Sequence, residues 1–179
     1  DGVIFDEGGL KITAFQVEHM PINIETGNVL GLRGETIGFR MDYKGHSVLF
    51  SGDTRSTEKS EINQVGKGVD LLIHEVQVPS PGATAEANLA NVSMSVHSTP
   101  EQVGHVFEKA KPKMGVYSHI IPPGTTAEDL VKGTRPYYKG PLTVAHDFME
   151  ITLKGDEIIV GERVKQSDGK FEDSNVLAK

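Results

Sequence analysis

The sequence predicts an α/β fold with a mixed sheet, on three observations. Residues 10–19 alternate apolar and polar side chains, a pattern typical of a strand with one face toward solvent. Residues 69–76 instead form a nearly continuous apolar run, which is typical of a strand buried on both faces. Residues 98–112 carry the start and stop signals of a helix. Strands that alternate with helices favour a layered α/β architecture.

The first part of the chain is expected to form three strands, at residues 10–19, 35–43 and 46–52. The last two of these are separated only by Lys44 and Gly45, which predicts a short hairpin. Residues 20–34 contain a proline and three glycines, and we expect a long loop there. A short helix is expected within residues 57–68, closed by glycine.

The second part is expected to add one strong helix and several strands. Either Ser98 or Thr99 caps the helix, and Pro100 sits in its first turn. The other predicted elements are a strand at 113–120, a short helix at 125–133 and closing strands within 141–164. We therefore expect one domain over residues 1–166, followed by a polar tail at 167–179.

The composition excludes several kinds of protein. The chain of 179 residues has no cysteine, so disulfides and thiolate metal sites are excluded. Its net charge of -7 gives no general attraction to nucleic acid or anionic membranes, although a local basic patch stays open. No apolar run reaches the roughly 18 residues needed to span a membrane. The cytoplasm and the periplasm are both compatible with this composition.

Polar residues that can bind metal follow the predicted strands. His19, Asp53 and His119 lie at or just past strand ends, and His97 opens the capped helix. Strand ends in layered α/β folds converge on one edge, and His19, Asp53 and His119 are suitable ligands for zinc, manganese or iron. Taken singly, Asp53 could merely cap a helix and each histidine could be a satisfied polar group. Their joint appearance at successive strand ends favours a site.

Six motifs follow one another along about residues 10–155. They are FQVEHMP, IGFRM, VLFSGDT, LLIHEV, VHSTPEQVGHVFEKAKP and MGVYSHI. As a set, and in this order, they resemble the motifs of the metallo-β-lactamase-fold hydrolases, in the branch similar to ribonuclease Z. The resemblance implies that this chain is the C-terminal half of an αβ/βα sandwich, with a mixed sheet and helices on its outer face.

The resemblance also implies roles for the site residues. His19 and His119 would each complete one of two metal sites, and Asp53 would bridge the two ions. Zinc is the expected metal, with manganese or iron as alternatives. His97 is not expected to be a ligand; it would be the proton donor to the leaving group, oriented by Glu75.

Two hydroxyl residues follow His97, and their role stays open. Ser98 and Thr99 lie at a helix N-terminus, where hydroxyls and free N–H groups favour an anionic substrate group. Plain helix capping explains both residues equally well.

The resemblance implies a metal-dependent hydrolase that uses a dinuclear metal-activated water on a phosphodiester or related ester. The alternatives are a β-lactam or lactone hydrolase, an aryl or alkyl sulfatase, and a non-catalytic half-domain that acts as a binding module. The substrate class is open between a small ester and RNA.

The family motif His-x-His-x-Asp-His, which supplies the first group of ligands, is absent from this sequence. We therefore expect a complementary N-terminal half carrying that motif, as the rest of the same protein or as a second chain. The three ligands in this chain should bind metal weakly without it. A homo-oligomer is a further expectation that the sequence leaves open.

Overall fold

The computed structural model describes residues 2–19, 36–79, 82, 84, 92–165 and 171–174. The chain divides into two compact units, Asp1–Thr143 and Val144–Lys179. The loop expected at residues 20–34 lies outside the described residues, as does most of 79–91. Within the first unit a seven-stranded sheet carries helices, so the predicted α/β fold with a mixed sheet is confirmed.

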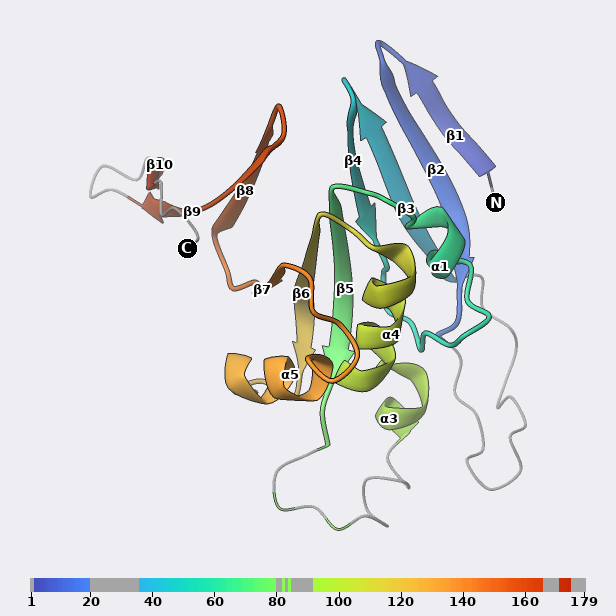
Figure 1. Cartoon of the computed structure of the whole chain (residues 1–179), viewed down its shortest axis with the longest axis vertical. Coiled ribbons are helices and arrows are strands. Elements are labelled where there is room, and N and C mark those ends of the chain that lie inside the picture. Colours follow the sequence, from blue (N-terminus) through green and yellow to red (C-terminus); the bar gives the residue numbers. More distant parts are fainter. Residues whose placement is uncertain are drawn as a thin grey trace. The chain divides into compact units, whose positions relative to one another are not determined.

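The strands of the sheet lie in the order in which they occur in the sequence (Figure 1). They are β1 (Gly2–Glu7), β2 (Leu10–Val17), β3 (Thr36–Tyr43), β4 (His46–Phe50), β5 (Leu71–Gln77), β6 (Met114–Ile121) and β7 (Leu142–Val144). Neighbours from β1 to β4 are antiparallel, whereas β4, β5 and β6 are parallel. It follows that β2, β4, β5 and β6 all run in the same direction, and their carboxyl ends meet at one edge.

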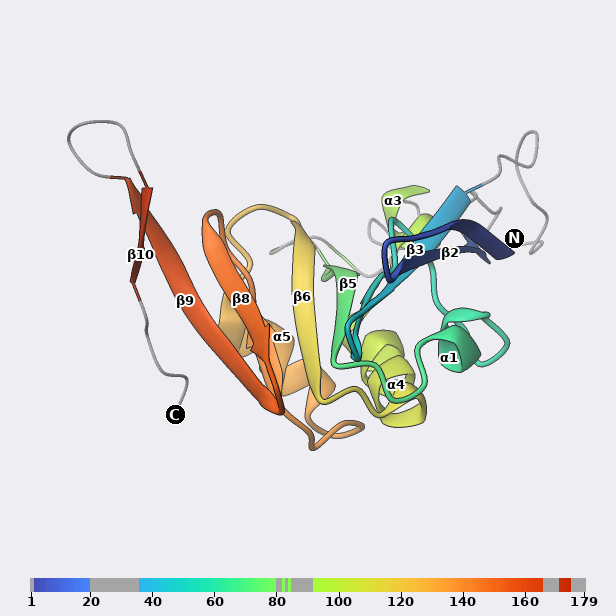
Figure 2. The same cartoon turned by 90° about the horizontal axis from the view of Figure 1, so that it is seen from above.

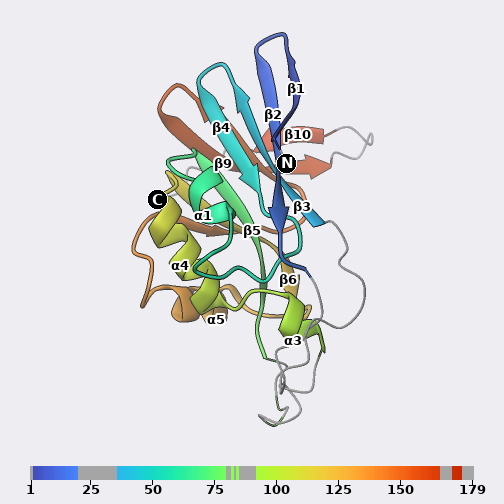
Figure 3. The same cartoon turned by 90° about the vertical axis from the view of Figure 1, so that its right-hand side faces the viewer.

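Four helices belong to the described part of this unit: α1 (Ile62–Val65), α3 (Val92–Val96), α4 (Pro100–Ala110) and α5 (Ala127–Thr134). Helices α1 and α4 lie on the same side of the sheet (Figure 2). Helix α3 lies at the end of the sheet toward which β2 and β5 run (Figure 3). The helix that follows α3 therefore starts close to the carboxyl ends of the strands.

Helix α4 begins at the cap that the sequence offered as one of two choices. Thr99 accepts a hydrogen bond from the Gln102 N–H, and the Gln102 side chain accepts one from the Thr99 N–H. This reciprocal pair is a capping box, which satisfies two N–H groups that the helix leaves free. The helix ends at Lys111, whose φ of 50° is left-handed.

Helix α1 is shorter than the helix expected over residues 57–68. Side chains compete there for the main-chain groups that a helix would use. The Thr57 N–H donates to Ser60 Oγ at 2.8 Å, and the Asn63 amide donates to the carbonyls of Thr57 and Ser60. Such local bonds favour turns over a helix.

The core between the sheet and α4 is built around Phe107, which is fully buried. Its ring packs against Tyr138 and Tyr117, with centroid distances of 5.3 and 5.7 Å. A Cβ at Gly115 on β6 would lie 2.8 Å from the Phe107 ring, so glycine lets the helix approach the sheet closely.

The opposite face of the sheet exposes large apolar side chains to solvent. On β3, Arg40 points to the helix side, because its guanidinium donates to the Val65 carbonyl of α1 at 2.7 Å. Side chains alternate along a strand, so Ile37 and Tyr43 point the other way, and they are 44% and 45% exposed. Phe50, paired with Phe39 of β3, adds a third such residue at 39% exposure.

The second unit consists, in its described part, of antiparallel strands. They are β8 (Met149–Lys154), β9 (Glu157–Lys165) and β10 (Phe171–Ser174), with β9 in the middle. A turn at Gly155 and Asp156 separates β8 from β9, which lie where the sequence predicted closing strands. Strands β1 and β10 were not predicted from the sequence.

Replacing Phe107 by alanine should lower the free energy of unfolding by about 3–5 kcal/mol, because the large buried ring leaves a cavity. Phe50→Ala is the matched control, since its ring is partly in solvent, and its loss should be well below that of Phe107→Ala. Urea unfolding followed by circular dichroism measures both. Equal losses would show that the core does not centre on α4.

Candidate metal and catalytic centre

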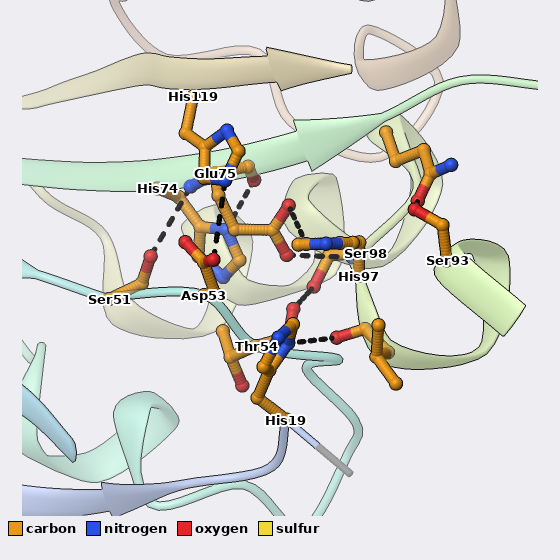
Figure 4. A network of polar contacts seen from close by, with 12 residues as sticks. His19, Ser51, Asp53, Thr54, His74, Glu75, Ser93, His97, Ser98 and His119 are labelled. Atoms are coloured by element: carbon orange, nitrogen blue, oxygen red, sulfur yellow. Dashed lines mark hydrogen bonds and ion pairs between the residues drawn. The ribbon is translucent and has the colours of Figure 1, made fainter. Parts of the chain in front are cut away.

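Four polar side chains converge where the parallel strands end (Figure 4). His19 follows β2 by two residues, and Asp53 follows β4 by three. His119 lies near the end of β6, and His97 lies in the short link between α3 and α4. The structure therefore brings together the residues that the sequence placed at separate strand ends.

The distances within this group suit metal binding. His19, Asp53 and His97 each offer a ligand atom, and these three atoms lie within 4.8 Å of one another. His119 Nε2 is 3.2 Å from Asp53 Oδ2. The ring centroid of His97 is 4.8 Å from that of His19 and 5.6 Å from that of His119.

His19 is held in the tautomer that leaves one nitrogen for a ligand. Its Nδ1 lies 3.1 Å from the Val96 carbonyl, which can only accept, so Nδ1 carries the proton. In this tautomer of the neutral ring, Nε2 is the nitrogen that is available to bind a metal ion. A carbonyl on the second ring nitrogen is the usual support for a metal-binding histidine.

Asp53 depends on the glycine before it. Gly52 has a φ of +63°, and a Cβ there would lie 2.9 Å from the Ile37 carbonyl oxygen. Glycine is the residue that accepts both the left-handed backbone and the close approach of β3. The Asp53 side chain is 43% exposed, so solvent reaches this carboxylate.

His119 has an unusual backbone for a histidine. Its φ is 46°, a left-handed value that costs a residue with a Cβ about 1–3 kcal/mol. The side chain is 50% exposed and faces Asp53. A strained residue of this kind, at a group of polar side chains, indicates a functional position.

Glu75 and His97 form a buried pair. His97 Nδ1 lies 3.2 Å from Glu75 Oε2, and the Ser98 N–H donates to Glu75 Oε1 at 2.8 Å. Burial raises the pKa of Glu75 to about 8, against the opposing effect of backbone hydrogen bonds. Burial also lowers the pKa of His97, and the nearby His19 ring adds to that effect. These directions favour a protonated Glu75 and a neutral His97. One proton then lies in the hydrogen bond between Glu75 Oε2 and His97 Nδ1, and the proton of the neutral ring is on Nε2.

The two hydroxyl residues after His97 have mainly structural contacts. Ser98 is fully buried; its hydroxyl donates to the Thr54 carbonyl at 2.7 Å and accepts from the Ser56 N–H at 2.8 Å. Thr99 caps α4. These contacts favour capping and bracing, and the substrate contacts expected for Ser98 and Thr99 stay predictions.

His74, which sits beside Glu75 on β5, supports the site from inside the core. Its Nδ1 lies 2.6 Å from the Glu75 carbonyl and its Nε2 lies 2.8 Å from Ser56 Oγ. Complete burial lowers the pKa of His74 to about 4, so the ring is neutral in the folded protein. Nδ1–H donates to the carbonyl, and Nε2 accepts from the Ser56 hydroxyl.

The donor set fits a divalent metal ion. It offers the imidazole rings of His19 and His119 and the exposed carboxylate of Asp53, which are ligands suited to zinc, manganese or iron. Geometry also groups His97 with His19 and Asp53. The Glu75 contact leaves Nε2 of His97 for a metal or for a substrate, so the separate roles of the site residues stay predictions.

The comparisons with known proteins identify the family of this chain. A family model described as a beta-lactamase superfamily domain matches residues 2–120. The chain belongs to that superfamily. The resemblance found in the sequence is thus confirmed, and the fold of this superfamily implies metal ions.

Relatives within the superfamily include two bacterial proteins named ribonuclease Z. The chain is 28% identical to that of Mycobacterium avium (strain 104) over 122 residues, which are 68% of this chain and 39% of the relative. It is 31% identical to that of Bacillus velezensis (strain DSM 23117 / BGSC 10A6 / LMG 26770 / FZB42) over 114 residues, 62% of this chain and 34% of the relative. The chain thus spans between a third and two fifths of these curated relatives.

Solved structures of the superfamily share the fold. The metallo-beta-lactamase fold protein YhfI from Bacillus subtilis matches with a TM-score of 0.58 and 16% identity, covering 79% of this chain and 48% of YhfI. The short form of human tRNase Z matches with a TM-score of 0.56 and 21% identity, covering 85% of this chain and 46% of tRNase Z.

Among the described residues, no helix is both long and apolar enough to cross a membrane.

Gly52→Ala should lower the free energy of unfolding more than Gly68→Ala does. Both glycines have a left-handed φ, which costs an alanine about 1 kcal/mol. Only the Gly52 variant also forces a Cβ against the Ile37 carbonyl, because nothing lies within 4 Å of a Cβ at Gly68. Urea unfolding of the two variants measures the difference, and equal losses would show that Asp53 does not depend on this close approach.

His74→Gln should lose less stability relative to wild type at pH 4.5 than at pH 7.5. An unfolded histidine takes up a proton below about pH 6.5, whereas the folded chain protonates His74 only near a pKa of about 4. Burial of the neutral His74 ring therefore makes its full contribution to the free energy of unfolding above about pH 6.5. This contribution is lost as the pH falls toward the folded pKa of about 4. The difference in free energy of unfolding between wild type and His74→Gln should therefore shrink by about 2 kcal/mol from pH 7.5 to pH 4.5.

Urea unfolding of both proteins across this pH range measures the gap. His105→Gln, at an exposed histidine on α4, is the control variant. A gap for His74→Gln that stays constant with pH would contradict the neutral, buried state of this ring.

Proposed function

We propose that this chain is the C-terminal half of a metal-dependent hydrolase that resembles ribonuclease Z and cleaves a phosphodiester or related ester. The observation that carries the proposal is the group formed by His19, Asp53 and His97, whose ligand atoms lie within 4.8 Å of one another, with His119 against Asp53. Two relatives named ribonuclease Z support the phosphodiester class.

His19, Asp53 and His119 would hold the metal. Zinc is the metal we propose, because imidazole and carboxylate ligands suit it. Metal ions bound there would supply Lewis acidity that activates water for attack on the ester and balances the charge that develops. The exposure of Asp53 and His119 leaves this side of the site accessible to a substrate.

His97 would supply the proton that the leaving group needs. Its Nδ1 faces Glu75, so Nε2 is the nitrogen that faces the other side chains of the site. As His97 gives up the Nε2 proton to the leaving oxygen, Nδ1 takes up the proton that it shares with Glu75. The buried carboxylate thereby keeps the ring oriented throughout the transfer.

The complementary half of the domain is the partner that we propose for the open face of the sheet. Ile37, Tyr43 and Phe50 expose apolar surface on the side away from α1. Apolar patches of this kind mark interaction sites. More than half of each relative lies outside the region that matches this chain, and that length is enough for a second sheet. That half would also supply the missing His-x-His-x-Asp-His ligands.

His97→Ala should keep the metal content and lower turnover of a small phosphodiester by about 100-fold or more, because it removes only the proton donor. Asp53→Ala should lose both metal and turnover, because the carboxylate binds the ions. The measurements are metal content by mass spectrometry and hydrolysis of bis(4-nitrophenyl) phosphate, with the chain joined to the complementary half of a superfamily domain.

His105→Ala is the matched control, since it removes an exposed histidine of α4 away from the site. Loss of metal from His97→Ala would reassign this residue as a ligand. Absence of metal from the joined protein would overturn the hydrolase and leave a binding module. Sulfate ester, lactone and β-lactam substrates belong in the same assay, and faster turnover of any of them would replace the phosphodiester class.

A further inference from the structure

We propose that Thr54 is a positioning residue that fixes Asp53 relative to His19 through its side-chain hydroxyl. This inference rests on the proposed function, because it concerns two ligands of the proposed metal site. Thr54 follows Asp53 directly in the chain and is only 1% exposed. No substrate can reach its hydroxyl, so the effect of Thr54 is exerted through its neighbours.

The hydroxyl of Thr54 contacts the main chain beside His19. The Glu18 N–H donates to Thr54 Oγ1 at 3.2 Å, and Oγ1 donates to the Glu18 carbonyl at 3.3 Å. Glu18 immediately precedes His19 and follows the last residue of β2, so it lies beyond the end of the strand. The Thr54 hydroxyl therefore contacts both the N–H and the carbonyl of Glu18, the residue bonded directly to His19.

A second contact runs alongside the first. The Arg55 N–H donates to the same Glu18 carbonyl at 2.6 Å. Ser60 Oγ, farther along the same segment, donates to Glu18 Oε2 at 2.7 Å. The segment after Asp53 is thus attached to Glu18 at several points, and the hydroxyl of Thr54 is the attachment nearest to Asp53.

The main chain of Thr54 faces the other half of the site. Its carbonyl accepts a hydrogen bond from the Ser98 hydroxyl at 2.7 Å. Ser98 in turn donates its N–H to Glu75, the partner of His97. Thr54 therefore connects the β2 end, the Asp53 turn and the Glu75–His97 pair, which come from distant parts of the sequence (Figure 4).

Removal of the hydroxyl should therefore move the ligands without removing any of them. The partly buried Glu18 N–H would lose its acceptor, so the Glu18 main chain would shift to find another partner. His19 would shift with it relative to Asp53. Loss of a group that orients metal ligands typically weakens metal binding by about 10- to 100-fold.

The test compares three variants of the 179-residue chain, each titrated with Zn²⁺ in a calorimeter to measure its affinity. Thr54→Val removes the hydroxyl at constant shape, and Thr54→Ser keeps the hydroxyl. Thr134→Val is the control, because Thr134 is fully buried too and its hydroxyl bonds Tyr117 and the Leu130 carbonyl in the core. Thr54→Ala replaces Thr54→Val if the valine variant does not fold.

We expect Thr54→Val to bind Zn²⁺ about 10- to 100-fold more weakly, Thr54→Ser to bind nearly as wild type does, and Thr134→Val to lose stability but not affinity. Affinity that falls no more in Thr54→Val than in Thr134→Val would overturn the inference. So would a Thr54→Ser protein as weak as Thr54→Val.

Hydrogen exchange of the Arg55 amide in the metal-free chain separates this inference from the proposed function. Thr54→Val should speed that exchange at least tenfold relative to Thr134→Val, and Thr54→Ser should restore the protection. If the wild-type chain has no affinity for Zn²⁺, the proposed metal site is refuted. The exchange rate of the Arg55 amide would still show whether Thr54 positions the Glu18 main chain. Unchanged Arg55 exchange in Thr54→Val would refute that role.

Discussion

The direction of four strands is the constraint on which the site depends. Strand β3 runs antiparallel to both β2 and β4, so β2 runs parallel to β4, β5 and β6. Their carboxyl ends consequently share one edge, and His19, Asp53 and His119 arrive there from segments far apart in the sequence. Reversal of β2 would carry His19 to the opposite edge. The long connection between β2 and β3 thus begins at the site itself.

The interior contributes to the site through polar groups that have little access to water. Glu75 is a carboxylate on a buried strand, and burial of such a group is costly unless it is hydrogen-bonded. Ser98 and His97 provide those bonds from the start of α4. His74, on the neighbouring position of β5, engages Ser56 beneath the Asp53 turn. The same buried network therefore fixes a helix, a turn and a strand at once.

The sequence contained enough local signal to predict most strands, the α4 helix and the convergence of the site residues. Local patterns could not reveal β1, whose apolar run is three residues long and whose pairing with β2 is a tertiary contact. The choice of Thr99 over Ser98 as the cap also depends on distant residues, because Thr54 and Ser56 engage the Ser98 hydroxyl. Contacts such as that between Thr54 and Glu18 join residues 36 positions apart, and no periodicity indicates them.

Strand β1 forms one edge of the seven-stranded sheet, and three consecutive side chains on it are exposed. Val3 and Ile4 are 54% and 60% exposed, and Phe5 is 42% exposed. An apolar edge strand is a ready template for edge-to-edge association of identical chains. Protein concentration therefore becomes a variable in every solution experiment on this chain. Dilute samples, or a lysine introduced at position 4, would keep self-association from being mistaken for a property of the metal site.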